Sequence, residues 1–309
     1  ITKKEVKEDY FKALLSNISF GKRKVKVVLD PGNGTTSILL ADLFKNIPVD
    51  YTIINGESNG TFPNHHPDPS IESNLEELKH AVIESKADVG LAFDGDGDRV
   101  GIISNLGKFV PIDYYMIIII RDIINKVKNK TFLYDVKCSK SLEDEIIKLG
   151  GTPYCYRTGN SYTKAKVKEL DLPFGGELSG HVYFRDKFLG FDSGIYAGIR
   201  LLEILSNTNK SVEELLEGVN KYYSTPEMKY KSRDDIKAKV IEKIQAYCEE
   251  KGYNINTIDG VRITFTDGWA SVRMSNTGPN ITARFEATTK ERLEEIKNEF
   301  EGLIKKYNN

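Results

Sequence analysis

The sequence is poor in cysteine, methionine and tryptophan, with three, three and one of these among 309 residues. The cysteines are Cys138, Cys155 and Cys248. Their number is odd and they contain no C-x-x-C pair, which argues against a disulfide framework or a zinc knuckle. Reduced cytosolic thiols are the simplest interpretation, so we expect a cytoplasmic protein.

Long hydrophobic runs and a charge excess are also missing. The longest apolar run, Tyr114 to Ile120, ends at Arg121, far short of the roughly 20 residues that span a bilayer. It predicts one helix of a core that is buried on several sides. The N-terminus is charged and amphipathic, unlike a secretory signal. A net charge of −1 gives no reason to expect nucleic acid or a membrane as partner. We expect a monomer.

The remaining composition is that of globular domains, with 39% apolar and 29% charged residues. The pattern predicts helices over 1–16, 35–44 and 74–86 and strands over 25–30, 49–54, 88–93 and 100–103. It continues with strands over 131–136 and 153–156 and helices over 141–149 and 194–205. Alternating strands and helices favour α/β units with mostly parallel sheets.

The last part of the chain has a different pattern. Here we predict helices over 234–251 and 290–306 and strands over 260–265, 269–274 and 282–287. The fold class is therefore α/β, with two similar mixed α/β sheet domains followed by a smaller α+β domain with an antiparallel sheet. We place the three domains at 1–108, 109–222 and 223–309.

The strongest chemical signal is Asp94-Gly95-Asp96-Gly97-Asp98-Arg99, directly after a predicted strand. Glycines let the backbone curl so that the three carboxylates converge. A hard divalent cation offsets their mutual repulsion, and oxygen-only ligands suit Mg²⁺. Arg99 adds a forked donor suited to a phosphoryl oxygen. An acidic surface turn does not need this spacing, and an EF-hand would require Gly and Glu where Arg99 and Asn105 stand.

Two further loops carry polar groups at suggestive spacing. In Gly175-Gly176-Glu177-Leu178-Ser179-Gly180-His181 a carboxylate, a hydroxyl and an imidazole alternate, which suits a polyol, and His181 can move protons near neutral pH. A tight turn with a surface histidine is the alternative. The segment Arg273 to Asn280 offers hydroxyls, an amide and one Arg to a phosphate. An ordinary hairpin turn explains it equally well.

Three other features stay open at this level. Lys137 follows a predicted strand end, where α/β sheets present ligand contacts, but it could be a solvated lysine. The segment Asn64 to Pro69 contains adjacent histidines and could hold a metal, although a rigid proline loop is the commoner case. Asp30 to Gly34 predicts a structural turn, and Trp269 is expected to pack in the last sheet.

Together these motifs resemble the α-D-phosphohexomutases, most closely the bacterial phosphomannomutase/phosphoglucomutase group. The matching segments occur in the family's order and cover essentially the whole chain: DPGNG (30–34), NGTFPNHHPDP (59–69), GLAFDGDGDRVG (90–101), DVKCS (135–139), GGELSGHVYF (175–184), GFDSGIYA (190–197) and RMSNTGPN (273–280). The metal loop and the GGELSGH loop in one chain make the match specific.

The resemblance implies a set of site residues. Asp94, Asp96 and Asp98 are then Mg²⁺ ligands, and Arg99, His181 and Lys137 take catalytic roles. The implied substrate contacts are Lys137, Glu177, Ser179, His181, Arg273, Ser275, Asn276 and Thr277. Hexose phosphate and hexose bisphosphate are the implied partners.

The chain departs from the family pattern in two places. No Ser-His-Asn-Pro type loop occurs, so we expect the family's N-terminal phosphoserine domain to be absent and to act as a missing partner. In Arg157 to Ser161, Asn160 stands where close relatives carry His, and an amide does not titrate.

The implied function is interconversion of hexose 1-phosphate and hexose 6-phosphate, of mannose, glucose or both. The route is a phosphoserine and a bisphosphorylated sugar, so the chain alone is expected to be inactive. Two alternatives remain: a Mg-dependent sugar-phosphate phosphatase or phosphotransferase with Asp94 as nucleophile, and a non-catalytic sugar-phosphate binding module.

Overall fold

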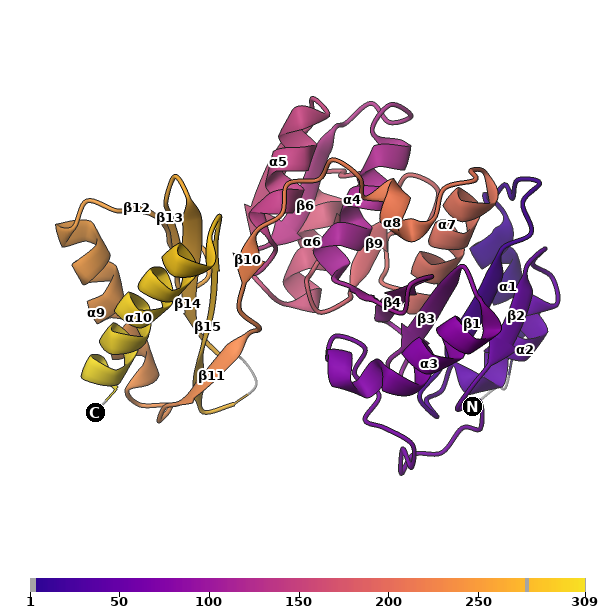
Figure 1. Ribbon diagram of the computed structural model, residues 1–309, viewed down its shortest axis with the longest axis horizontal. Helices are drawn as coiled ribbons and strands as arrows, with labels where there is room; N and C mark the ends of the chain where they lie inside the picture. Colours follow the sequence, from indigo (N-terminus) through magenta and orange to yellow (C-terminus); the bar gives the residue numbers. More distant parts are fainter. Residues whose placement is uncertain (1–3, 276–277, 309) are drawn as a thin grey trace. The chain divides into compact units, whose positions relative to one another are not determined.

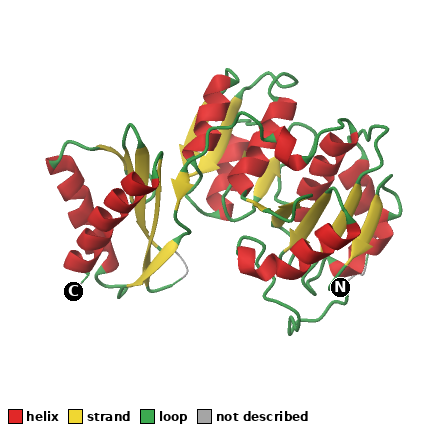
Figure 2. Ribbon diagram, in the orientation of Figure 1, coloured by secondary structure: helices red, strands yellow, loops and turns green. Residues whose placement is uncertain are grey.

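The computed structural model describes residues 4–275 and 278–308. It contains three sheets with helices packed against them (Figure 1 and Figure 2). These residues form two compact units. The first unit takes the described residues up to Tyr134 together with Ile146–Tyr154 and Asn160–Gly218, and the second takes Asp135–Glu145, Cys155–Gly159 and the described residues from Val219.

The first sheet has the strand order β2-β1-β3-β4-β5. Its strands are β1 (Lys26–Asp30), β2 (Asp50–Ile53), β3 (Val89–Phe93), β4 (Val100–Ser104) and β5 (Phe109–Val110). Strands β2, β1 and β3 are parallel, whereas β4 and β5 are antiparallel additions. The accompanying helices are α1 (Lys7–Leu15), α2 (Ser37–Phe44), the 3₁₀ turn η1 (Glu72–Leu75) and α3 (Glu76–Ser85).

The second sheet has the order β7-β6-β8-β9. Its strands are β6 (Thr131–Asp135), β7 (Thr152–Tyr156), β8 (Phe174–Gly176) and β9 (Val182–Phe184). Strand β8 runs parallel to β6 and antiparallel to β9. The helices of this region are α4 (Ile112–Ile123), α5 (Lys140–Lys148), α6 (Asn160–Glu169), α7 (Gly194–Ser206) and α8 (Val212–Leu215).

Helices α4 and α7 join the first two sheets within the first unit. Helix α4 packs on both β4 and β8, and α7 packs on β3 and β4. The apolar run predicted as a core helix is α4, and every side chain from Tyr115 to Ile120 is buried. Replacing one of these isoleucines by alanine would cost about 2–5 kcal/mol of stability. This packing brings the turn after β3 close to the turn after β8.

The third sheet lies in the second unit and is antiparallel, with the order β10-β15-β14-β13-β12 and β11 paired to β15. Its strands are β10 (Tyr223–Ser224), β11 (Met228–Lys231), β12 (Asn254–Asn256), β13 (Val261–Thr264), β14 (Gly268–Met274) and β15 (Asn280–Ala287). Helices α9 (Lys237–Glu250) and α10 (Lys290–Tyr307) cover one face (Figure 1). Their apolar side chains share a core with Val261, Ile263 and Phe285 of the strands.

These sheets confirm the predicted fold class, and some element boundaries differ. The helix predicted over 74–86 begins as η1 and continues as α3. The segment 157–161 was expected to be a loop, but Asn160 begins helix α6. This helix is strongly polar, so hydrophobic periodicity gives no signal for it. Strands β5, β8, β9, β10 and β12 are too short to be predicted from alternation, and the short strand β11 was not predicted either. No helix among the described residues is both long and apolar enough to cross a membrane.

Candidate functional site

The acidic loop follows β3 and turns sharply back into β4. Gly97 has a φ of 80°, a backbone conformation that favours glycine because glycine has no side chain. One carboxylate oxygen each from Asp94, Asp96 and Asp98 lies within 4.8 Å of the others. The predicted convergence of the three side chains is therefore present in the structure, and it is the arrangement that a single cation requires.

This cluster is electrostatically unfavourable without a cation. Two unit charges 4.8 Å apart repel each other by about 3.5 kcal/mol at an effective dielectric constant of about 20. Burial and the charges of Asp94 and Asp96 raise the pKa of Asp98 to about 7, although His181 acts in the opposite direction. Burial and Asp94 also raise the pKa of Asp96. An oxygen-only donor set of this charge fits Mg²⁺.

Arg99 is held by two carboxylates from different loops. Its Nε donates to Asp94 Oδ2 at 2.7 Å, and its Nη1 donates to Asp68 Oδ1 at 3.0 Å. The other oxygen of Asp94 accepts from the backbone N–H groups of Gly97 and Arg99, both at 3.0 Å. Asp94 is thus buried with both oxygens engaged, so it is a poor nucleophile.

The turn between β8 and β9 lies directly against the acidic loop. The backbone N–H of Val100 donates to Gly180 O at 3.4 Å, and Arg99 and His181 form an isolated antiparallel bridge. A β-carbon on Gly180 would meet Val100 O at 2.9 Å, so this approach requires glycine. The structure therefore brings the predicted metal loop and the predicted sugar loop together.

His181 lies between two carboxylates. Its Nδ1 is 3.1 Å from Asp192 Oδ2 and 3.5 Å from Asp98 Oδ1. Burial lowers the pKa of His181, but the hydrogen bond to Asp192 and the charge of Asp98 outweigh it, so the net pKa is raised. Asn160 Nδ2 donates to the same oxygen of Asp192 at 2.5 Å. The amide of Asn160 thus contacts the His181–Asp192 pair.

The N-terminus of α7 also lies against the acidic loop. Gly194 N donates to Gly97 O at 2.9 Å, and a β-carbon on Gly194 would meet Arg99 O at 2.3 Å. Glu177 is buried and accepts from Thr163 Oγ1 at 2.9 Å. Ser179 is half-buried in the β8–β9 turn. Three loops of the first unit therefore place their polar groups around one acidic centre.

The other predicted residues belong to the second unit. Lys137 lies just after β6, with its Nζ 3.3 Å from Glu227 Oε2 and 3.6 Å from Asp135 Oδ2. Arg273 on β14 donates from Nη1 to Met274 O at 3.1 Å.

The loop after β14 is only partly described. Ser275 N donates to Asn280 O at 2.9 Å, which closes this loop. Asn276 and Thr277 lie outside the described residues.

Several residues that support this site were not expected from the sequence. Asp68 and Asp192 orient Arg99 and His181, and Thr163 donates to Glu177. The turn at 30–34 is structural, as expected, and Gly34 packs against Asp94 O, which a β-carbon would meet at 2.9 Å. Asp68 lies between two prolines, and Asp192 precedes the N-cap of α7. Both lie in segments that match the family, NGTFPNHHPDP (59–69) and GFDSGIYA (190–197), and that match is the signal that could have identified them.

The paired histidines do not add a metal site. His65 Nε2 lies 3.1 Å from Asp30 Oδ2, and His65 Nδ1 lies 3.0 Å from His66 O. Asp30 is fully buried, and its hydrogen bond to His65 raises the histidine pKa to about 9. Through these hydrogen bonds a protonated His65 holds the 59–69 loop in place, and a protonated imidazole does not bind a cation.

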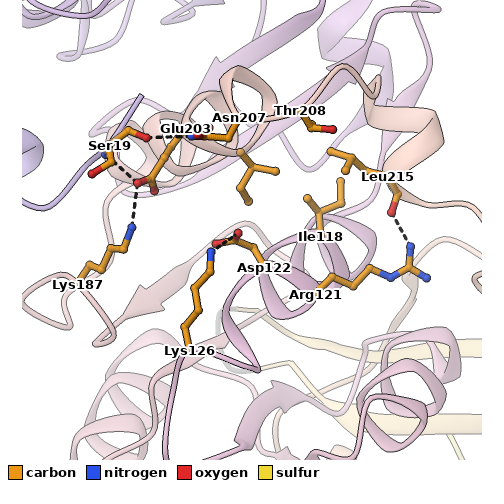
Figure 3. A pocket seen from close by; sticks show the side chains of 11 residues that line it. Ser19, Ile118, Arg121, Asp122, Lys126, Lys187, Glu203, Asn207, Thr208 and Leu215 are labelled. Atoms are coloured by element: carbon orange, nitrogen blue, oxygen red, sulfur yellow. Dashed lines mark hydrogen bonds and ion pairs between the residues drawn. The ribbon is translucent and has the colours of Figure 1, made fainter. Parts of the chain in front are cut away.

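A separate cavity of about 460 Å³ lies in the first unit among α4, α7 and α8 (Figure 3). Ile118, Ile204 and Leu215 line it together with charged side chains. Figure 3 shows these charges paired: Lys126 with Asp122 at 2.6 Å and Lys187 with Glu203 at 2.8 Å. None of the predicted site residues that the structure describes lines this cavity, so it is distinct from the acidic centre.

Comparison with known families gives three matches in chain order. The phosphoglucomutase/phosphomannomutase alpha/beta/alpha domain II matches residues 8–107, domain III of the same family matches residues 111–222, and its C-terminal domain matches residues 227–303. These matches cover nearly the whole chain.

Curated relatives and solved structures agree with these matches. The phosphomannomutase/phosphoglucomutase of Pseudomonas aeruginosa is 40% identical over 96% of this chain and 64% of its own length. The phosphoglucomutase of Neisseria meningitidis serogroup A is 36% identical over 98% of this chain and 66% of its own length. A crystal structure of a family protein from Burkholderia thailandensis has a TM-score of 0.91 at 35% identity, covering 99% of this chain and 65% of that chain. The chain thus spans just under two thirds of the length of these relatives.

Proposed function

The chain belongs to the phosphoglucomutase/phosphomannomutase family of α-D-phosphohexomutases, and on that premise we propose that it serves the interconversion of hexose 1-phosphate and hexose 6-phosphate. The observation that carries this proposal is the meeting of the acidic loop and the β8–β9 turn at the Arg99–His181 bridge. A carboxylate trio beside a polyol-binding loop suits a sugar phosphate that reacts next to a cation.

In the proposed reaction, a phosphoserine donates its phosphoryl group to the free O1 or O6 hydroxyl of the hexose phosphate. The resulting bisphosphorylated sugar returns its other phosphoryl group to the serine. The sequence of this chain contains no Ser-His-Asn-Pro loop, so we propose that the phosphoserine belongs to a missing partner domain. The 309-residue chain alone is then inactive as a mutase.

Mg²⁺ is the proposed cofactor, with Asp94, Asp96 and Asp98 as its ligands. When bound, it supplies positive charge that stabilises a phosphoryl group during transfer. An N-acetylphosphoglucosamine mutase of Aspergillus fumigatus was solved with GlcNAc-6P and magnesium, at a TM-score of 0.68, 16% identity and coverage of 96% of this chain and 68% of that chain. At this identity the likeness supports the fold alone, so our metal assignment rests on the carboxylate geometry of this chain.

The side chains of the acidic centre take distinct proposed roles. Arg99 is fixed by Asp68 and Asp94 and donates to a phosphoryl oxygen. Glu177 and Ser179 contact sugar hydroxyls, which both donate and accept hydrogen bonds. His181 is oriented through Nδ1 by Asp192, which leaves Nε2 for a proton of the sugar hydroxyl. Burial lowers the pKa of His181, but the hydrogen bond to Asp192 and the charge of Asp98 raise it above its ordinary value, and His181 is the proposed proton-transfer residue.

The remaining roles lie in the second unit. We propose that Lys137 contacts the substrate and that Arg273, Ser275, Asn276 and Thr277 bind the phosphate group that is not transferred. A cytoplasmic location and a monomeric state stay predictions.

One observation bears on the first of the two alternatives. A phosphatase that uses Asp94 as nucleophile is disfavoured, because both carboxylate oxygens of Asp94 accept hydrogen bonds. A trapped aspartyl-phosphate at Asp94 would reverse that judgement. A non-catalytic binding module would bind the same ligands but would show no mutase activity when the phosphoserine domain is added.

Calorimetric binding to the 309-residue chain with Mg²⁺ tests the proposal. Glucose 1-phosphate and glucose 6-phosphate should bind one site and compete with each other, because both orientations of the sugar must be accepted. Free glucose should bind far more weakly, and a dehydrogenase-coupled assay should show no turnover by the chain alone. Independent binding of the two isomers at separate sites would contradict the mutase assignment, and turnover would contradict the proposed need for a partner domain.

A further inference from the structure

The C-terminal sheet has a second buried face, opposite to the one that α9 and α10 cover. This face carries Arg262 on β13, Trp269 on β14, and Arg284 and Glu286 on β15, each at most 8% exposed. Ser271 is paired with Arg262 on one side and with Arg284 on the other, so the two arginines lie in one row across three strands. Buried arginines are costly unless their donors find acceptors.

Their acceptors are backbone groups next to Lys137. Arg262 Nη1 donates to Val136 O, and Arg284 Nη1 donates to Lys137 O. Glu286 Oε1 accepts from the backbone N–H of Lys140 at 2.8 Å. Lys140 begins α5, so Glu286 supplies negative charge at a helix N-terminus, where it is favourable. Three charge-assisted hydrogen bonds, which are stronger than neutral ones, thus hold the five consecutive residues 136–140.

Arg284 also holds the segment that carries the counter-ion of Lys137. Its Nε donates to Thr225 O at 3.2 Å, two residues before Glu227. Glu227 Oε2 in turn lies 3.3 Å from Lys137 Nζ. One guanidinium therefore fixes the backbone of the lysine and the backbone next to its carboxylate partner.

Trp269 contacts all three members of this arrangement. Its ring centroid lies 4.3 Å from the guanidinium carbon of Arg262 and 5.9 Å from that of Arg284. Its Nε1 donates to Glu286 Oε1 at 2.7 Å. It is the single tryptophan of the sequence, so tryptophan fluorescence, excited selectively over tyrosine, reports on this place alone.

We propose that Arg262, Arg284 and Glu286 form a backbone clamp that positions Lys137 for the substrate, and that Trp269 reports whether the clamp is closed. The three are positioning residues, since they act through Lys137. This inference rests on the proposed sugar-phosphate site only for the consequence on binding. The clamp itself is testable without a ligand.

The ligand-free test compares the 309-residue chain with its Arg284→Met and Glu286→Gln variants. Arg292→Met is the matched control, because Arg292 lies 5.2 Å from the ring of Phe265 and forms its ion pairs with Asp267 and Glu295. We expect the first two variants, but not the control, to shift Trp269 emission and to raise the acetylation rate of Lys137 several-fold in pulse labelling read by mass spectrometry. If Arg284→Met does not fold, the Trp269 emission and Lys137 labelling of Glu286→Gln decide whether the clamp exists. Unchanged Lys137 labelling in a folded variant with shifted emission would overturn the positioning role.

The ligand test is a double-mutant cycle with glucose 6-phosphate and Mg²⁺. Arg284→Met should weaken binding about tenfold in the parent chain and hardly at all in the Lys137→Ala background, because coupled residues are non-additive. Equal losses in both backgrounds would show that Arg284 acts independently of Lys137 and would refute the inference. If the parent chain binds no hexose phosphate, the proposed function fails, whereas the labelling result still decides the clamp.

Discussion

Replacing Asp98 by asparagine should stabilise the metal-free protein while abolishing its response to Mg²⁺. Asparagine keeps the shape of the side chain but removes one of three charges whose oxygens lie within 4.8 Å of one another. Each relieved repulsion is worth about 3.5 kcal/mol at an effective dielectric constant of about 20. Asp98 is 30% exposed, and it also loses its attraction to His181, so we expect a net gain of about 1–2 kcal/mol.

The stabilisation of this variant should depend on pH. Burial and the neighbouring carboxylates raise the pKa of Asp98 from 3.8 to about 7. A carboxylate with a raised pKa in the folded state destabilises that state wherever the same carboxylate is ionised in the unfolded chain. The advantage of Asp98→Asn should therefore be full above about pH 7 and should vanish as the pH falls towards 3.8.

Mg²⁺ should reverse the order of the two proteins. At 100 times its Kd, Mg²⁺ stabilises the parent chain by about 2.7 kcal/mol, and a hundredfold loss of affinity reduces this to about 0.4 kcal/mol. Thermal unfolding at pH 8 measures both effects, at about 2–4 °C per kcal/mol. The control is Asp9→Asn, because the Asp9 side chain is 77% exposed. A metal-free Asp98→Asn variant with a lowered Tm, or one with the parent's response to Mg²⁺, would refute the reasoning.

Three further predictions address the loops around this centre. His65→Asn should lower the free energy of unfolding in urea by about 1–2 kcal/mol at pH 6 and by little at pH 10. The reason is that folding raises the pKa of His65 from 6.5 to about 9, so its stabilising effect is full below pH 6.5 and is lost as the pH rises through 9. Equal costs at both pH values would contradict this. Gly194→Ala should lower stability by about 1–3 kcal/mol and weaken Mg²⁺ binding, because its β-carbon would lie 2.3 Å from Arg99 O. Gly302→Ala has open space and serves as its control. Thr163→Val should weaken glucose 6-phosphate binding about threefold to tenfold in calorimetry by removing the hydroxyl that donates to Glu177, and unchanged affinity would remove Glu177 from the proposed site.

The parts of the fold that sequence could predict are those with strong periodicity. The buried strands β1 and β3 and the core helix α4 were expected close to their observed positions. Their long apolar patterns allow one solution only. By contrast, α6 has Val167 as its one buried apolar side chain, and β8 contains two glycines. These elements are specified by packing on their neighbours, which no local pattern records.

The residues of the site also divide into those that a local sequence pattern predicts and those that it does not. The spacing of Asp94, Asp96 and Asp98 predicted their convergence, because glycine spacing is a local property. Asp68 and Asp192 were not predicted, since each reaches its partner across 31 or 11 residues of sequence. The clamp on Lys137 could not be predicted from the sequence either. Its two arginines donate to backbone carbonyl groups, which every residue carries. Long-range hydrogen bonds of this kind require the fold before they can be recognised.

The most direct test of the central claim uses Mn²⁺ in place of Mg²⁺, since both prefer oxygen ligands. The chain has four histidines, whose ring proton signals can be followed by NMR. His181 lies 3.5 Å from Asp98, whereas His80 is an exposed residue of α3. Substoichiometric Mn²⁺ should broaden the His181 signal first, spare that of His80, and be displaced by excess Mg²⁺. Uniform broadening, or a His181 signal that broadens equally in the Asp98→Asn variant, would contradict a metal site at the acidic loop.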